Sequence, residues 1–456
     1  MDENLLTTFA RQGTELLYQD DPFLYDLLER EYQRQANTLA LVASSSIVDP
    51  SVLACEGLSP VNVTAEGYPG RRFHAGCKLI DEIEQLAIDR AKQIFGAQYA
   101  NVQPHCASSA NEIVMMGLLK PGDTILGMEL QYGGHLTHGA RASISGQYFT
   151  AVGYGVGEAG LLDYDQVHKL AEESRPQLIV CGATAYPRVI DFKRFREIAD
   201  DVGALLLADI THIAGLVTAG LHPSPIDFAH FTTTCTHKQL CGPRGGLILM
   251  GKDSHSLAPD GKRTLSELIQ SAVFPLLQGA PVPNVIAAKA RAFARAGTGD
   301  FKILAERILT DARSLAGYFI EKGYDLICGG TDNHIVLIDL AHRGPTGAIA
   351  ESALEESHII VNKNKVPGDK RSSLVTSGIR LGTNSVAIRK MGPAEMKRCA
   401  DLIDKVLTSI EVLGERDYRL DKRVRDSVRN DVKNLCEEFP IPRYPLLKAT
   451  AADGTV

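Results

Sequence analysis

Short apolar runs recur along this chain, and their pattern constrains the fold more than any other feature. The runs at 124–128, 178–182, 204–208 and 246–250 are each bounded by turn residues, and amphipathic stretches such as 192–202 separate some of them. Such runs are typical of parallel strands buried on both faces, and their alternation with helices predicts βαβ units. We therefore expect an α/β fold with a doubly wound, mostly parallel sheet and ligands at the carboxyl ends of its strands.

Length and local patterning predict three parts in the 456 residues. Residues 1–35 are polar and charge-rich with scattered leucines, and are expected to form a helical arm. Residues 36–283 carry the apolar runs and form the expected cofactor-binding domain. Residues 284–456 are expected to form a linker helix and a smaller α+β domain. Its expected elements are helices at 284–296, 301–322 and 394–411 and a strand at 334–340.

Composition limits the possible partners. The net charge is −7 and the basic residues form no stripe, which argues against nucleic acid. No uninterrupted apolar run approaches the length of a membrane span, and the N-terminus lacks a signal-peptide pattern. Nine cysteines without metal-ligand spacing indicate reduced thiols. We expect a cytoplasmic protein with a small-molecule ligand and without metal, membrane or nucleic acid.

One lysine stands in a setting that suits covalent catalysis. A polar, β-branched run, 231–236, leads to Lys238 in a glycine-rich turn. A lysine that forms a Schiff base must be accessible and have hydroxyl groups nearby, although a surface lysine before a tight turn is an equal alternative on these residues alone. Upstream, the strand at 204–208 ends in Asp209. A carboxylate there can keep the pyridine nitrogen of pyridoxal phosphate protonated.

Several longer motifs occur in one order along the chain. Together they resemble the serine hydroxymethyltransferase family from about residue 36 to about residue 415. The resemblance implies pyridoxal 5'-phosphate as cofactor, the aspartate-aminotransferase-like fold known as fold type I, and a homodimer or tetramer whose active sites are shared between subunits. The motifs are Ala65–Arg72, Gly133–Gly139, Asp209–Leu216, Thr236–Lys238 with Gly242–Gly246, and Thr376–Arg380.

The resemblance also implies the cofactor contacts. Lys238 would hold the cofactor and Asp209 would contact its ring nitrogen. Ala107 and Ser108 would bind the phosphate, since they open an apolar helix whose first amides suit an anion, although an ordinary helix cap would also explain the serine. Without the resemblance, His135 would be interpreted as a loop residue and His212 as a core histidine. The remaining expected contacts are His135 on the ring, Thr184 and His212 at its phenolic oxygen, and Thr236 and Gly279.

A second set of residues is expected to act on the substrate. Arg380 can bind an α-carboxylate through two parallel hydrogen bonds, with Ser44 as its helper. Glu66 matches the family's acid/base carboxylate, whereas without the motif it would be read as a solvated glutamate. His74 and His237 are further catalytic candidates. Thr64 and Phe73 are expected to face the substrate.

The chain departs from the family pattern around this substrate set. Family members usually carry tyrosines where this chain has Thr64, Phe73 and His74, and Ser-Glu-Asn where it has serines at 44–46. These tyrosines are associated with the cofactor phosphate, folate packing and substrate chemistry. Asn362–Asn364, near the family's folate region, is retained. Other departures are Thr211, Ala280 and Asn284.

Three functions are compatible with these residues. The departures favour an enzyme that acts without folate on a β-hydroxy-α-amino acid, eliminating the hydroxyl group and adding a nucleophile. That nucleophile can belong to the substrate, as in a hydroxyarginine-like molecule that cyclises. The alternative is a serine hydroxymethyltransferase or threonine-type aldolase, which cleaves the bond between the α- and β-carbons with or without tetrahydrofolate. A non-catalytic family member is the third, and the retention of Lys238, Asp209 and Arg380 argues against it.

Overall fold

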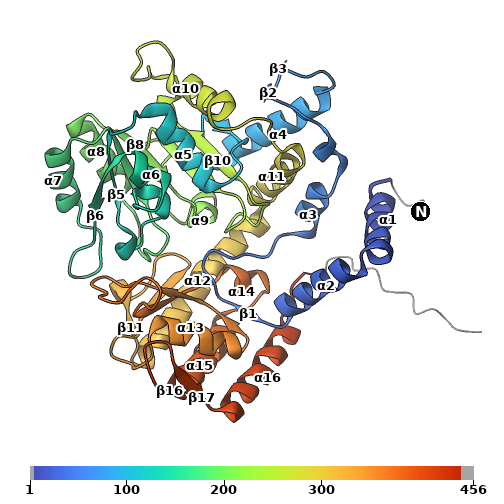
Figure 1. Cartoon of the computed structure of the whole chain (residues 1–456), viewed down its shortest axis with the longest axis vertical. Helices are drawn as coiled ribbons and strands as arrows, with labels where there is room; N and C mark the ends of the chain where they lie inside the picture. The colour runs from blue at the N-terminus through green and yellow to red at the C-terminus, as the bar shows by residue number, and fades with distance from the viewer. Residues whose placement is uncertain (1–4, 443–456) are drawn as a thin grey trace, which may run out of the picture.

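A computed structural model of the chain describes residues 5–442. Figure 1 shows a large domain around a central sheet, a smaller domain beside it, and two N-terminal helices that project from one side. The predicted arm is therefore two helices, α1 (Leu5–Asp20) and α2 (Pro22–Ala36), and neither has a buried side chain. Asp21 starts the second helix, because its side chain accepts a hydrogen bond from the Leu24 amide and proline follows at the first position.

The predicted domain limits at 35 and 283 stay predictions. Residues 1–4 of the predicted arm and 443–456 of the predicted C-terminal domain lie outside the described residues.

Seven strands form the central sheet, in the order β4-β10-β9-β8-β7-β5-β6. The five strands from β6 to β9 are parallel to their neighbours, which confirms the mostly parallel sheet of fold type I. The strands are β4 (Tyr99–Asn101), β5 (Thr124–Met128), β6 (Thr150–Tyr154), β7 (Leu178–Gly182), β8 (Leu205–Asp209), β9 (Phe231–Cys235) and β10 (Gly246–Met250).

The direction of β10 corrects one expectation. The run at 246–250 was expected to be a parallel strand, but β10 is antiparallel to both β9 and β4. Only residues 236–245 separate β9 from β10, too few for the crossover that a parallel strand requires. The two strands therefore form a hairpin, and Thr236 closes its turn by donating from its amide to the Gly245 carbonyl at 3.0 Å. This turn carries Lys238 at the carboxyl end of β9.

Both faces of the sheet are covered by helices. Along β7, Leu178 and Val180 pack into one core and Ile179 and Cys181 into another, as the period of two along a strand requires. Because both faces are buried, the sheet exposes functional side chains only at strand ends and in loops. The first core includes α5 (Ala107–Leu118) and α10 (Leu265–Ser271); the second includes α4 (Lys78–Phe95), α7 (Tyr164–Ser174), α8 (Phe192–Val202) and α11 (Pro283–Ala296).

The smaller domain is built on a four-stranded sheet in the order β11-β12-β15-β14. Pairing of β14 with β15 sets Asn362 opposite Arg380, and pairing of β12 with β15 sets Ile335 opposite Gly382. The small domain's strands are β11 (Asp325–Leu326), β12 (Ile335–Asp339), β14 (Asn362–Asn364) and β15 (Gly378–Gly382), and its helices include α12 (Gly299–Glu321), α13 (Gly347–Glu356), α15 (Pro393–Thr408) and α16 (Lys422–Glu438).

The helix predicted at 394–411 is shorter than expected. It ends at Thr408, because Ile410 and Val412 pair with Leu420 and Tyr418 in a small hairpin, β16 (Ile410–Val412) and β17 (Tyr418–Leu420). β-Branched residues favour such extended pairing over a further helical turn.

Two expectations from composition concern the described residues directly. Among residues 5–442, no helix combines the length and the apolar character needed to cross a membrane. All nine cysteines are free thiols, and Cys77, Cys181, Cys235, Cys241, Cys399 and Cys436 are buried.

Asp311, on α12, is a buried carboxylate, and neither of its oxygens has a hydrogen-bond partner among the described residues. Burial raises the pKa of Asp311 to about 7, although Arg307 opposes the shift. An aspartate in the unfolded chain titrates near about 3.9. The folded protein therefore binds more protons between the two values, and the stability that Asp311 contributes is lost as the pH rises through this window.

We expect Asp311→Asn, which is neutral at every pH, to raise the free energy of unfolding at pH 8 by about 2–4 kcal/mol. The gain should shrink towards pH 5, where Asp311 is itself protonated. Urea unfolding at both pH values measures it, with Glu306→Gln, an exposed change on the same helix, as control. A gain of equal size at both pH values would contradict the assignment.

Candidate active site

Lys238 lies in the hairpin turn between β9 and β10, next to a histidine from the loop after β8. Its Nζ atom is 2.8 Å from Nε2 of His212. Burial lowers the pKa of Lys238, although Cys235 and Asp209 oppose the shift. A buried amine with a lowered pKa is neutral more of the time, and a neutral amine is the form that attacks a carbonyl carbon.

A second histidine supports His212 from the small domain. His334 immediately precedes β12, and its Nε2 lies 3.4 Å from Nδ1 of His212 and 3.1 Å from the Ala43 carbonyl oxygen. The two rings stack with centroids 5.6 Å apart. Burial lowers the pKa of His334 to about 3 and that of His212 well below its usual range, so both rings are neutral at physiological pH.

Asp209 ends β8 and is held by three donors. Oδ2 accepts hydrogen bonds from Nδ2 of Asn111 at 2.9 Å and Nε2 of His138 at 3.0 Å, and Oδ1 accepts from the Thr211 amide at 3.0 Å. Burial alone would raise the pKa of Asp209, but the hydrogen bond and charge from His138, with His135 and the Thr211 amide, hold it well below the usual range. The carboxylate is therefore a fixed negative charge at the carboxyl end of the sheet.

Backbone amides select the tautomers of the neighbouring histidines. The His135 amide donates to Nδ1 of His138, so the proton of His138 is on Nε2, where it faces Asp209. In the same way the Thr137 amide donates to Nδ1 of His135. The ligand atoms of these two histidines and Asp209 lie within 4.8 Å of one another, as metal ligands would. The proton between His138 and Asp209 occupies the lone pair that a metal would need.

Arg380, on β15, is a buried guanidinium group. It donates from Nη1 to the Thr184 carbonyl oxygen at 2.5 Å and from Nε to Oδ1 of Asn362 at 3.1 Å. Burial lowers its pKa to about 10, so the group stays charged at neutral pH. No carboxylate among residues 5–442 forms an ion pair with Arg380. A buried cation with only neutral partners is suited to binding an anionic ligand.

The first turn of α5 faces the same region. Ala107 and Ser108 are its first two residues and are partly buried. The loop before the helix is fixed by Gln278, whose Oε1 accepts from the His105 amide at 3.0 Å and whose Nε2 donates to the Gln103 carbonyl at 3.1 Å. The free amides of a helix N-terminus attract phosphate.

Glu66 belongs to a different group of predicted residues. Its Oε2 lies 3.2 Å from Nε2 of His74, and a Cβ atom built on Gly279 would lie 3.7 Å from its Oε1. Thr64 is exposed, and Phe73 is 74% exposed with its ring against Phe274. Within residues 5–442, no hydrogen bond or ion pair joins this group to the group around Lys238.

The remaining predicted residues have structural contacts. The Thr236 hydroxyl donates to the Pro243 carbonyl at 2.6 Å and so closes the hairpin turn. His237 has its Nε2 3.4 Å from Nη1 of Arg244, and burial lowers its pKa to about 4. Ser44 is partly buried and follows Ala43, whose carbonyl contacts His334. The roles proposed for these three residues stay predictions.

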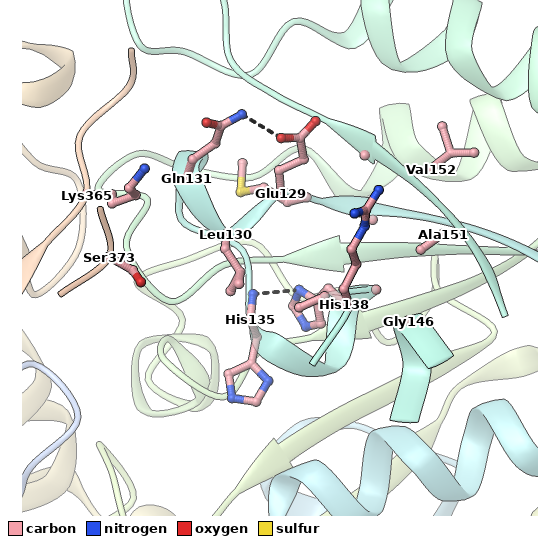
Figure 2. A pocket seen from close by; sticks show the side chains of 16 residues that line it. Glu129, Leu130, Gln131, His135, His138, Gly146, Ala151, Val152, Lys365 and Ser373 are labelled. Carbon is pink, nitrogen blue, oxygen red and sulfur yellow. Dashed lines mark hydrogen bonds between the residues drawn. The ribbon is translucent and has the colours of Figure 1, made fainter. Parts of the chain in front are cut away.

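A cavity of about 780 Å³ opens beside His135. Figure 2 shows His135 and His138 together on one side of it and the hydrogen-bonded pair Glu129 and Gln131 on another, while Lys365 and Ser373 approach from a separate segment. Its size is that of a site for a small organic molecule. The cavity therefore leaves room for a ligand next to His135 and His138, of which His138 donates to Asp209.

A family model described as serine hydroxymethyltransferase matches residues 17–403. The chain belongs to the serine hydroxymethyltransferase family. It is 47% identical over 423 residues to a serine hydroxymethyltransferase of Chromohalobacter salexigens, covering 93% of this chain and 97% of that protein. It is 48% identical over 433 residues to a serine hydroxymethyltransferase of Halorhodospira halophila, covering 95% and 99%. Members of this family are pyridoxal-phosphate enzymes, and so is this chain.

The described residues fit the cofactor of the serine hydroxymethyltransferase family. A buried anionic carboxylate, a buried amine and a helix N-terminus suit the ring nitrogen, aldehyde and phosphate of pyridoxal phosphate. In addition, the Thr211 hydroxyl and Nδ1 of His237 are buried without a hydrogen-bond partner among the described residues. Buried polar atoms of this kind are usually satisfied by a bound group or by water.

Several residues of this site were not predicted from the sequence. Asn111 and His138 hold Asp209, the Thr233 hydroxyl donates to Oδ1 of Asn111 at 2.5 Å, and His334 supports His212. His138 stands three residues after His135 in the same glycine-bounded motif, and Asn111 stands one turn after Ala107, so their spacing was a usable signal. No local signal marks His334, which is 122 residues from His212.

Proposed function

We propose that this chain is a serine hydroxymethyltransferase, which cleaves and forms the bond between the α- and β-carbons of a β-hydroxy-α-amino acid. The observation that carries the proposal is the grouping of three side chains: the partly buried amine of Lys238, the fixed carboxylate of Asp209 and the guanidinium of Arg380, which has no carboxylate partner in the described part of the chain. The activity named for both of its relatives supports the same proposal. We therefore prefer the hydroxymethyltransferase reaction, which the sequence left open as the alternative, to elimination of the hydroxyl group without folate.

The roles of the side chains follow from their chemistry. When bound, pyridoxal phosphate supplies an electron sink for the bond that breaks at the α-carbon. Lys238 would hold the cofactor covalently through its amine. Asp209 keeps a proton on the ring nitrogen, and Arg380 binds the substrate carboxylate and so orients the α-carbon. Glu66 takes the proton from the β-hydroxyl group.

Hydroxymethyl transfer also requires space for a second substrate, the carrier of the one-carbon unit. The cavity of about 780 Å³ beside His135 is a candidate space for it, although Lys238, Asp209 and Arg380 do not line this cavity. Tetrahydrofolate is the expected carrier. The cavity does not separate the two reactions, because addition of an external nucleophile would also use a second ligand.

The second candidate function remains elimination of the β-hydroxyl followed by addition of a nucleophile. The contact between His74 and Glu66 at 3.2 Å favours it, because an imidazole beside a carboxylate can protonate a leaving hydroxyl group. One experiment separates the two. The holoenzyme is incubated with serine, threonine and 3-hydroxyarginine, with and without tetrahydrofolate, and products are identified by mass spectrometry. Folate-dependent glycine from serine supports the first function, whereas loss of water without glycine supports the second.

The active site is completed by a second copy of the chain in this proposal. Two observations support a homodimer with shared sites: the Glu66 group has no hydrogen bond or ion pair to the Lys238 group within residues 5–442, and Phe73 in the Glu66 group is largely exposed. Mixing Lys238→Ala and Glu66→Gln subunits tests it. Hybrid dimers should regain one intact site each, or about a quarter of wild-type activity for random pairing. If both groups act within one subunit, the mixture stays inactive.

Arg380→Lys should weaken binding of the amino acid by about 1–3 kcal/mol, because lysine keeps the charge but cannot form two parallel hydrogen bonds to a carboxylate. Titration of the holoenzyme with glycine, followed by the cofactor's absorbance, measures the affinity. Arg313→Lys, an exposed change on α12, is the control. Unchanged affinity would move the carboxylate site elsewhere.

A further inference from the structure

The backbone around Glu66 has a fixed and unusual conformation. Ala65 is fully buried, and Gly67 has φ of +97°, where a Cβ atom would lie 2.4 Å from the Arg71 carbonyl oxygen. The Phe73 amide donates to the Glu66 carbonyl at 3.0 Å across the short hairpin of β2 (Gly67–Tyr68) and β3 (Arg71–Arg72). Glu66 therefore stands at a bend that only glycine permits on its carboxyl side.

Arg72 binds both carbonyl groups that flank Glu66. Its Nη1 donates to the Ala65 oxygen at 2.9 Å and to the Gly67 oxygen at 2.8 Å. The same guanidinium donates from Nε to Asp81 at 2.7 Å and from Nη2 to Glu84 at 2.6 Å. The Arg72 side chain is only 4% exposed and that of Glu84 1%. The planar guanidinium group of Arg72 thus joins the bend at residues 65–67 to helix α4.

The hydrogen-bond network around Arg72 continues to the turn before α5. Nε2 of Gln103 donates to Glu84 at 2.7 Å and to the Gly67 carbonyl at 2.9 Å. Lys289 donates to the Val102 and Pro104 carbonyls, on either side of Gln103, at 2.6 and 3.1 Å. The Gly67 carbonyl is therefore held by two buried donors, and the network is rooted in the segment that leads to Ala107 and Ser108.

The contacts of Arg72 do more than neutralise the buried carboxylate of Glu84. A buried ion pair between Arg72 and Glu84 is weak evidence for stability, because desolvation opposes its attraction. Burial raises the pKa of Glu84, and Arg72 opposes that shift. What distinguishes Arg72 is that one nitrogen is directed at the carbonyl groups of the two residues on either side of Glu66, which fixes the backbone from which the Glu66 side chain extends.

We propose that Arg72 is the positioning residue of Glu66: it fixes the bend at residues 65–67 so that the carboxylate stays directed at its substrate. The proposal rests on the catalytic role of Glu66 stated above. It assigns Arg72 no contact with substrate or cofactor.

The test uses Arg72→Lys in the full-length holoenzyme, with Arg71→Lys as matched control, since Arg71 is the exposed neighbour on the same strand. Lysine keeps a charge near Glu84 but cannot span two carbonyls and two carboxylates. We expect hydrogen exchange of the 64–74 segment without substrate to accelerate at least about tenfold and the remaining segments to be unchanged. We also expect kcat for serine cleavage to fall about tenfold with KM within about twofold, as misplacement of a reacting group predicts.

A double-mutant cycle decides whether Arg72 acts through Glu66. In the Glu66→Gln background, Arg72→Lys should have no further effect on kcat. An equal fall in both backgrounds, or unchanged exchange in segment 64–74, would overturn the proposal. Full activity of Glu66→Gln alone would overturn the catalytic role of Glu66. Hydrogen exchange of segment 64–74 would then still test whether Arg72 fixes the bend. If Arg72→Lys does not fold, Arg72→Met with Glu84→Gln removes both charges together and takes its place, with the same expected exchange and kcat.

Discussion

Lys238→Ala should lower kcat by at least about a thousandfold, the largest effect expected in this chain. The substitution removes the covalent attachment of the cofactor and also the nearest amine able to accept a proton at the α-carbon. It leaves His212 without its partner at 2.8 Å. Burial lowers the pKa of Lys238 and so favours the neutral, nucleophilic amine, and no substitute amine lies in the same turn.

The measurement has two parts. Steady-state rates compare Lys238→Ala with Lys302→Ala, an exposed change on α12 that should be neutral. Borohydride reduction of the wild-type holoenzyme, followed by peptide mapping, should place the cofactor on the peptide that contains Lys238. A label on another lysine would refute the assignment.

Asp209→Asn should lower kcat by about a hundredfold or more while the cofactor stays bound. The side-chain oxygen of asparagine can still accept a hydrogen bond from the Thr211 amide. Asparagine has no negative charge, however, to hold a proton on the ring nitrogen. The carboxylate is ionised across the accessible pH range because its pKa is held well below normal, so the loss should not vary with pH. Without that proton the α-carbon should lose its hydrogen slowly.

Exchange of the α-hydrogen of glycine in deuterated water, followed by NMR, measures this step directly. Cofactor content after gel filtration separates a chemical defect from loss of binding. His138→Leu is the graded comparison, since it removes one donor to Asp209 and keeps the carboxylate, and its effect should be smaller. Equal exchange rates in Asp209→Asn and wild type would mean that Asp209 does not act on the ring nitrogen.

Much of the large domain was predictable because a strand buried on both faces must be apolar along its whole length. The run at 178–182 matches β7, and the run at 124–128 matches β5. The edge strand β6 was not predicted, because Thr150 and Ala151 are exposed and its apolar signal is weak. The direction of β10 followed from the length of one turn, which the pattern of apolar runs does not encode.

The candidate site likewise contains residues that local sequence predicts and residues that it does not. Lys238 and Asp209 were found because each has a strong local context at a strand end. His334 was not, since only the packing of β12 beside the large domain brings it to His212. Local sequence also does not show whether the Glu66 group contacts the Lys238 group. Within residues 5–442 no hydrogen bond or ion pair joins them, and this depends on where the hairpin of residues 67–72 stands relative to the sheet.

The placement of His334 has a mechanical consequence. Arg380 lies on β15 and His334 immediately precedes β12, the strand paired with β15, so the two residues belong to one small sheet and the segment that enters it. Arg380 reaches across to Thr184 of the large domain, and His334 reaches across to His212. A shift of the small domain that altered the contact between Arg380 and Thr184 would also alter the distance from His334 to His212. The two contacts therefore link the guanidinium group of Arg380 to the imidazole that touches Lys238.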